Sequence, residues 1–190
     1  MHKSRAFYDC IAKIPCIWRR PGRIQAGERR AEFVEGVDLM PTALELCGLE
    51  IPDGVQGFSH APGLLGREPF RRKAACFAEV GHEGTALTMR DLQSWNLPES
   101  AFRSSTRDWV LFPGVYAGKG KMVRTERWKL SYYEEGVGEL YDMIDDPWEL
   151  KNLYNSPDHE AIVNELKAML LDWTIETENT LPSLPPDVKI

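Results

Sequence analysis

The fold is decided by residues 122–143, which read MVRTERWKLSYYEEGVGELYDM. Between 122 and 133 the side chains alternate with an imperfect period of two, which is typical of a β-strand. The turn residues 134–136 follow, and a second short strand pattern runs from Gly138 to Met143. The stretch therefore predicts an antiparallel hairpin of strands 122–133 and 138–143.

The flanking segments predict one more strand and a long helix. Residues 74–80 read as a strand, and residues 145–147 (Asp-Asp-Pro) read as a turn. Ser156 and Pro157 begin the last helix, as a cap and a first-turn proline. Its apolar stripe consists of Ile162, Leu166, Met169, Leu170 and Trp173.

The first third of the chain predicts two helices and a strand. Residues 6–13 indicate a short helix in which Asp9 and Lys13 are spaced to pair, and residues 14–18 indicate a buried strand at a sheet edge. Residues 38–47 indicate a helix that Asp38 caps and Gly48 ends. The inward face of that helix is expected to consist of Leu39, Ala43, Leu46 and Cys47, widened by Met40 and Leu44. Residues 54–66 are expected to form a loop.

Composition excludes several classes of protein. The 190 residues carry a net charge of −6, which argues against a nucleic-acid partner. The basic cluster at 67–73 is expected to be a solvated loop. The sequence has no run of 18 apolar residues, so no membrane span is predicted. No apolar segment follows the first five residues, so no secretory signal is predicted, and the chain as it stands is expected in the cytoplasm. The four cysteines are expected to be free, buried thiols (Cys10, Cys16, Cys47 and Cys76).

Several strings, in one order, are similar to the second half of sulfatases in the alkaline-phosphatase-like superfamily. They are Lys3 with Phe7-Tyr8-Asp9 and Lys13-Ile14-Pro15, Trp18-Arg19-Arg20-Pro21-Gly22, Val37-Asp38-Leu39-Met40-Pro41-Thr42, Val55-Gln56-Gly57-Phe58-Ser59, Val123-Arg124-Thr125-Glu126-Arg127-Trp128-Lys129-Leu130, and Glu139-Leu140-Tyr141-Asp142 with Asp146-Pro147. The resemblance leaves chiefly residues 82–118 uncovered, and insertions of this kind shape substrate specificity in the family.

The resemblance implies an α/β architecture in which the chain divides into three parts. Residues 1–66 are expected to be the end of a large alkaline-phosphatase-like mixed-sheet domain. Residues 67–179 are expected to form a small C-terminal antiparallel sheet with the last helix packed on it, and residues 180–190 an extended tail.

The family's chemistry requires groups that this sequence does not contain. The resemblance implies a Cys/Ser-x-Pro-x-Arg nucleophile, converted to formylglycine, and a divalent cation, usually calcium, held by hard oxygen donors. At Cys16 the motif would need a proline where Trp18 stands, and after Ser183 the arginine is missing. No metal ligand set is expected in this chain, which is expected to be inactive alone.

Two residues carry over as candidate substrate contacts. Lys3 matches the family lysine that contacts the sulfate group, and a compact ammonium suits charge on the sulfate oxygens. His2 is a weaker candidate as a neighbour of the site. For Lys3, an exposed lysine without a role is the alternative.

Other polar and aromatic groups have an ordinary structural interpretation beside a functional one. Asp142, Asp145 and Asp146 suggest a cation site, but a capped turn is favoured. Charged side chains at 124, 127 and 129 would face an anionic substrate or simply solvent, and a solvated strand face is favoured. His82-Glu83 is taken as a loop pair. A sugar or aryl group would stack on Trp95, Trp109 and Tyr116, but burial of these rings is favoured.

Two functions remain open. The first is a C-terminal portion of a sulfuric ester hydrolase acting on a sulfate-ester small molecule or glycan, with a phosphonate or phosphate ester hydrolase of the same superfamily as a variant. The second is a non-catalytic assembly module, whose partner is a separate N-terminal half chain or a second copy.

Overall fold

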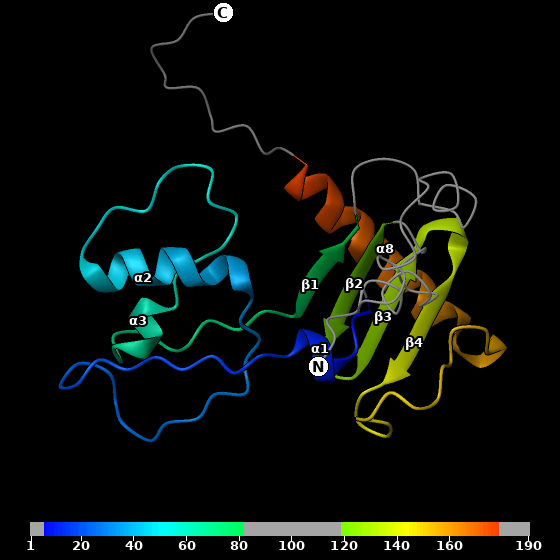
Figure 1. Cartoon of the computed structure of the whole chain (residues 1–190), viewed down its shortest axis with the longest axis horizontal. Coiled ribbons are helices and arrows are strands. Elements are labelled where there is room, and N and C mark those ends of the chain that lie inside the picture. Colours follow the sequence, from blue (N-terminus) through cyan, green and yellow to red (C-terminus); the bar gives the residue numbers. More distant parts are fainter. Residues whose placement is uncertain (1–5, 82–118, 179–190) are drawn as a thin grey trace, which may run out of the picture. The chain divides into compact units, whose positions relative to one another are not determined.

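The computed structural model describes residues 6–81 and 119–178 of the chain (Figure 1). The chain divides into two compact units. The first consists of residues 1–14 and 77–170, and the second of residues 15–76 and 171–190. The insertion at 82–118 and the predicted tail at 180–190 lie outside the described residues. The assignment of residues 1–66 to the end of a larger domain stays a prediction.

A four-stranded sheet forms the core of the first unit. Its strands are β1 (Ala75–Val80), β2 (Gly120–Thr125), β3 (Trp128–Tyr133) and β4 (Gly138–Asp142), in the order β1-β2-β3-β4. β2 and β3 pair antiparallel, and so do β3 and β4. Val123 lies opposite Leu130, which lies opposite Leu140, and all three are fully buried.

The single strand predicted for 122–133 is two strands. A two-residue turn at 126–127 separates β2 from β3, and the backbone N–H of Trp128 donates to Oγ1 of Thr125 at 2.9 Å. The alternating pattern hides this turn because it runs through Glu126 and Arg127 without a glycine or proline. The second predicted turn is confirmed: the 3-10 helix η2 (Glu134–Gly136) joins β3 to β4, and Gly136 has a φ of 78°.

The helix predicted after residue 156 is confirmed. The 3-10 helix η3 (Pro157–His159) leads into α8 (Glu160–Thr177), which lies along the sheet (Figure 1). Leu166 and Leu170 of the predicted stripe are buried, together with Val163. Ser156 precedes the first turn, but its hydroxyl lies 3.0 Å from Nδ1 of His159 and does not cap a backbone N–H.

The second unit contains the 3-10 helix η1 (Gly36–Asp38) and the helices α2 (Leu39–Cys47) and α3 (Ala61–Leu64). The predicted helix and its left-handed end at Gly48, with a φ of 75°, are confirmed. The short helix α3 stands in the segment that was expected to be all loop.

The predicted inward face of α2 is wrong except for Leu46. Leu39 and Met40 are 36% and 51% exposed, whereas Pro41 and Thr42 are buried. Polar contacts orient this helix: Oγ1 of Thr42 accepts the backbone N–H of His60 at 2.9 Å. Apolar periodicity alone could not reveal a hydroxyl as an inward residue.

The strand predicted at 14–18 is absent, and the predicted burial of the cysteines is wrong for three of them. Ile14 and Ile17 are 67% and 87% exposed, and residues 13–20 have no regular structure. All four cysteines are free as predicted, but only Cys76 is partly buried, whereas Cys10, Cys16 and Cys47 are exposed. Upstream, the predicted helix is the single turn α1 (Asp9–Ala12).

Candidate functional site

The two candidate substrate contacts, His2 and Lys3, lie outside the described residues. Their roles therefore stay predictions. The described segment that begins at Ala6 is held against the sheet at three consecutive positions. The Phe7 ring stacks on Tyr133 with the ring centres 5.9 Å apart, and the Tyr8 hydroxyl donates to Glu139 at 2.9 Å.

The third position is Asp9, which belongs to a buried ion cluster. Nζ of Lys129 lies 2.8 Å from Oδ1 of Asp9 and 2.8 Å from Oε1 of Glu149. The backbone N–H of Asp9 also donates to Oε2 of Glu149 at 2.6 Å. The Lys129 side chain is only 1% exposed, so the solvated strand face predicted for it is wrong. Asp9 pairs with Lys129 in place of the predicted Lys13.

Glu149 adopts a backbone conformation that L-residues seldom take. Its φ of 59° is the one positive φ of a non-glycine residue among the described residues. A left-handed residue of this type costs roughly 1–2 kcal/mol. The contacts of its buried carboxylate with Lys129 and Asp9 offset that cost.

The phenols beside this cluster are kept neutral. Burial raises the pKa of Tyr8, and the carboxylate of Glu139 raises it further. Burial likewise raises the pKa of Tyr141. Neither hydroxyl is therefore a ready base or nucleophile at neutral pH.

The aspartates that follow β4 form the predicted turn. The carboxylate of Asp142 accepts the backbone N–H groups of Ile144 at 3.1 Å and Asp145 at 3.3 Å. It also accepts two hydrogen bonds from Arg127, at 2.9 and 2.8 Å. These contacts satisfy the carboxylate without a metal ion, and they engage Arg127, one of the charged residues that the sequence places toward an anionic substrate or solvent.

A second buried ion cluster lies in the second unit. Asp38 is fully buried, and its carboxylate lies 2.7 Å from Nζ of Lys73, which also contacts Glu35. The backbone N–H groups of Glu35 and Phe58 donate to the same carboxylate at 2.9 and 3.1 Å. Burial by itself raises the pKa of Asp38, but the hydrogen bonds, that from Lys73 first, outweigh burial and lower it. Lys73 is thus not part of a solvated loop, and Asp38 braces two segments rather than capping α2.

His60 lies against this cluster in an aromatic setting. It is 2% exposed, and Nε2 lies 3.4 Å from Oδ2 of Asp38. Phe70 stacks on its ring at 4.6 Å, and Phe58 lies tilted on it at 4.8 Å. Burial lowers the pKa of His60, and this effect outweighs that of Asp38, which raises the pKa. The imidazole is therefore neutral at pH 7 and serves the packing of the unit.

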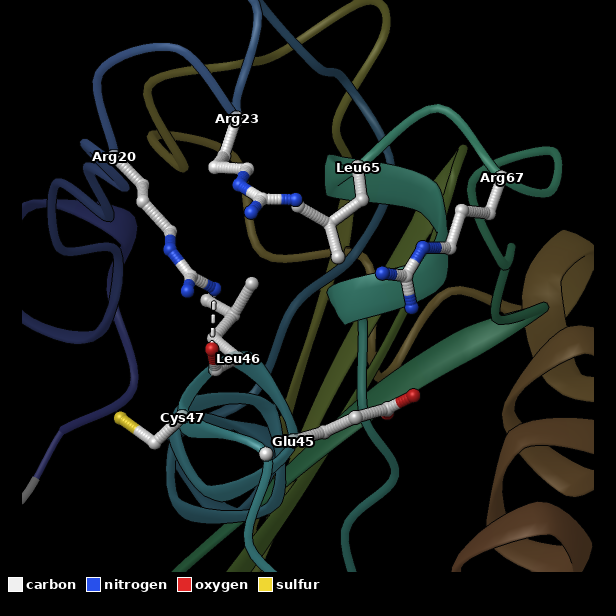
Figure 2. A pocket seen from close by; sticks show the side chains of 8 residues that line it. Arg20, Arg23, Glu45, Leu46, Cys47, Leu65 and Arg67 are labelled. Atoms are coloured by element: carbon white, nitrogen blue, oxygen red, sulfur yellow. Dashed lines mark hydrogen bonds between the residues drawn. The ribbon is translucent and has the colours of Figure 1, made fainter.

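A pocket of about 260 Å³ opens at the C-terminal end of α2 (Figure 2). Three arginine side chains line it, together with Glu45 of α2 and a mostly apolar wall. The arginines are Arg20, Arg23 and Arg67, and the wall consists of Leu46, Cys47, Gly48 and Leu65. Arg20 belongs to one of the sulfatase-like strings and Leu65 to the segment predicted as a loop, and nothing in their spacing indicates a shared pocket.

The predicted absence of a complete catalytic set in this chain stays a prediction. In residues 6–81 and 119–178, no group of three or more His, Cys, Asp or Glu side chains would hold a metal ion. No helix in those ranges has the length and hydrophobicity that crossing a bilayer requires. His82, Trp95, Trp109 and Tyr116 lie outside the described residues, so their interpretations stay open.

Comparison with known proteins points to one family. The family described as "N-sulphoglucosamine sulphohydrolase, C-terminal" matches residues 1–83 and 99–176. A Delta 4,5-hexuronate-2-O-sulfatase from Bacteroides thetaiotaomicron is 30% identical over 97% of this chain and 33% of its own length. An N-acetylglucosamine-6-O-sulfatase from the same organism is 26% identical over 98% of this chain and 28% of its own length.

Solved structures agree with the family in fold. A solved structure of a protein in complex with its substrate, D-glucosamine-2-N,6-O-disulfate, superposes with a TM-score of 0.68 at 22% identity, over 94% of this chain and 31% of its own. The phosphonate monoester hydrolase of Silicibacter pomeroyi superposes with a TM-score of 0.62 at 25% identity, over 86% of this chain and 29% of its own. The chain spans about a third of the length of these relatives. It belongs to the family of the N-sulphoglucosamine sulphohydrolase C-terminal region, and it is the C-terminal region of a sulfatase in the alkaline-phosphatase-like superfamily.

Proposed function

We propose that this chain forms the C-terminal part of a sulfuric ester hydrolase that acts on sulfated sugars. The observation that carries the proposal is the match over 97% of the chain to a protein named as a hexuronate 2-O-sulfatase. The second relative, named for a 6-O-sulfate on N-acetylglucosamine, supports the same substrate class. The position of the sulfate on the sugar is left open, because these two relatives differ in it.

In this proposal Lys3 contacts the sulfate group. Its ammonium stabilises the charge that develops on the sulfate oxygens, and His2 is its neighbour. The anchoring of residues 7–9 supports the role, because the segment that follows the candidate contact is held against the sheet. Phe7 is 4% exposed, and Asp9 is tied to Lys129 at 2.8 Å.

The 190 residues are not expected to hydrolyse a sulfate ester alone. No Cys/Ser-x-Pro-x-Arg motif occurs in the sequence. The nucleophile and the carboxylate ligands of a divalent cation, calcium in the intact family, would come from residues beyond this chain. Hard oxygen donors such as Asp and Asn suit that ion.

A hybrid protein tests the proposal. The C-terminal third of the hexuronate 2-O-sulfatase is replaced by this chain, and hydrolysis of an aryl sulfate and an aryl phosphonate is measured with calcium and with manganese. We expect turnover of the sulfate by the hybrid and none by the isolated chain. In the hybrid, Lys3→Ala should lower kcat by about 10²-fold, the usual effect of removing one donor to a developing oxyanion.

The matched control is Lys151→Ala, because Lys151 is an exposed lysine outside the segment of Lys3. A folded hybrid in which both alanine variants keep full activity would remove Lys3 from the site. Calcium-dependent turnover by the isolated chain would show that nucleophile and ligands lie within these 190 residues. Faster turnover of the phosphonate would favour the phosphonate hydrolase variant, which the similarity at 25% identity keeps open.

The assembly module is the second candidate function. It is favoured by the exposure of large apolar side chains in the second unit, such as Ile17 at 87%, Met40 at 51% and Leu49 at 59%. Apolar surface of this kind marks sites that another chain covers. Light scattering of the purified chain tests it: a stable monomer that binds no sulfatase N-terminal fragment would exclude it.

A further inference from the structure

The pocket at the end of α2 is built on three ordered turns. Arg20 and Arg23 belong to one turn, in which the backbone N–H groups of Arg23 and Ile24 donate to the Arg20 carbonyl at 3.0 and 2.9 Å. Gly22 stands in that turn with a φ of 71°. The two guanidinium groups therefore start from a backbone that is already fixed.

Arg67 approaches the pocket from the end of α3. Its backbone N–H donates to the Pro62 carbonyl at 2.9 Å, and Gly66 before it has a φ of 65°. The third turn closes α2, where the N–H groups of Gly48 and Leu49 bond the carbonyls of Glu45 and Leu44. These backbone bonds satisfy the carbonyls of Leu44 and Glu45 near the end of α2.

The arginines differ in what holds them. Arg20 donates to the Leu46 carbonyl (Figure 2). This contact accounts for Arg20 as a side chain that caps the C-terminal end of α2. Arg23 and Arg67 make no side-chain hydrogen bond or ion pair within the described parts of the chain, and Figure 2 shows both pointing toward Leu65 from different sides. Capping of the helix therefore accounts for one arginine and leaves two guanidinium forks directed into the pocket.

The charge of the pocket is positive in an acidic protein. Three arginines and one glutamate line it, a formal excess of two positive charges, whereas the whole chain carries −6. Glu45 forms no ion pair with these arginines. Guanidinium forks match the paired oxygens of sulfate and carboxylate groups, and they lose little hydration on binding them.

We propose that Arg23 and Arg67 form a binding site for the sulfate group of a sulfated sugar unit, with Leu46 and Leu65 as the apolar wall against the sugar. The volume of about 260 Å³ is just below the range of roughly 300–1,000 Å³ for drug-sized ligands, which suits one monosaccharide rather than a longer chain. The choice of a sugar as the carrier of the sulfate rests on the proposed function.

Direct binding to the purified chain tests the site. Glucose 6-sulfate, glucose, glucuronate and inorganic sulfate are titrated separately at low ionic strength, and the arginine Nε–H resonances are followed by NMR. We expect saturable shifts with glucose 6-sulfate, weaker binding of glucuronate and of inorganic sulfate, and none of glucose. Binding should weaken as salt is raised, because exposed charges are screened over about 10 Å at 0.1 M.

Matched variants locate the site. Arg23→Gln and Arg67→Gln should each raise the Kd for glucose 6-sulfate about tenfold, the loss of one charged hydrogen-bonding group. Arg29→Gln removes the same charge from an exposed arginine outside the pocket and should leave Kd unchanged. Arg20 is left intact because its contact with Leu46 supports α2.

Three results would overturn the inference: no saturable binding, equal weakening in all three variants, or inorganic sulfate binding as tightly as the sugar sulfate. The titration needs no turnover, so a failed hydrolysis assay leaves it intact. Turnover by the hybrid without binding at Arg23 and Arg67 would overturn this inference alone.

Discussion

Nζ of Lys129, in the middle of the sheet, lies 2.8 Å from Oδ1 of Asp9, a residue 120 positions earlier in the chain. The lysine is 1% exposed and also contacts the buried carboxylate of Glu149. This single ammonium therefore joins the N-terminal segment, β3 and the turn after β4. The segment it holds is the one that follows the candidate sulfate contact Lys3.

Removal of the Lys129 charge should destabilise the protein strongly. Lys129→Met leaves the carboxylates of Asp9 and Glu149 without their cation, and breaking a buried pair in this way costs about 3–5 kcal/mol. Urea unfolding followed by circular dichroism measures the loss. The control is Lys121→Met, which breaks an ion pair with Glu79 whose side chains are 33% and 67% exposed, and should cost less than about 1 kcal/mol. Equal losses in the two variants would contradict a special role for the buried cluster.

Gly57 should tolerate no side chain. A Cβ at this position would stand 2.0 Å from the Val37 carbonyl oxygen, and a backbone atom cannot move aside. Gly57→Ala is expected to destabilise the second unit by about 1–3 kcal/mol, the usual cost of overpacking. Gly36→Ala is the control, because a Cβ there meets nothing within 4 Å. Thermal unfolding of both variants decides the matter, and a Gly57→Ala midpoint equal to that of Gly36→Ala would show that the approach is not tight.

Stability should fall as pH drops from 7.5 to 5. Burial lowers the pKa of His60 in the folded chain, so the unfolded chain, with a histidine pKa of about 6.5, binds the proton first. The free energy of unfolding therefore decreases through this window. Lys73 and Arg71 face the imidazole and oppose its protonation, whereas Asp38 favours it. His60→Phe should reduce the dependence of the urea midpoint on pH between 7.5 and 5. An unchanged pH dependence in this variant would assign the effect to other groups.

A second loss of stability is expected at lower pH. The folded pKa of Asp38 lies below its ordinary value of 3.8, so its contribution is present above that value and is lost as pH falls through the folded pKa. His60→Phe should keep this acid transition. Asp38→Asn should weaken it and lower stability at pH 7, because Lys73 then loses a partner. Unfolding of the Asp38→Asn variant measured at pH 7 and pH 3 checks both signs.

Three of the four thiols should react quickly in the native chain. Cys10, Cys16 and Cys47 are exposed and free, whereas Cys76 is partly covered. An aromatic disulfide reagent should therefore label three thiols in a fast phase and the fourth in a slower one. Cys47→Ser should reduce the fast phase by one thiol, and a fast phase that stays at three would mean that Cys47 is not accessible.

Local patterns in the sequence were sufficient for several elements and for the family. The turn before Gly138, the apolar stripe with Leu166 and Leu170, and the left-handed end at Gly48 are set by neighbours within a few residues, and all are confirmed. The order of the sulfatase-like strings is likewise a property of the chain itself. Such signals survive without knowledge of distant contacts, because they depend on backbone geometry and on periodicity.

The tertiary structure alone decided which polar groups lie inside. Lys129 looks like a solvated strand residue until Asp9, far away in the sequence, supplies its counter-charge. Thr42 rather than Leu39 faces inward on α2 because it meets the backbone of His60. The grouping of Arg23 with Arg67 likewise arises only when two turns 44 residues apart close on the same end of α2. A charge or hydroxyl can be buried at low cost only where a compensating group contacts it. The fold, and not the local sequence, decides which group that is.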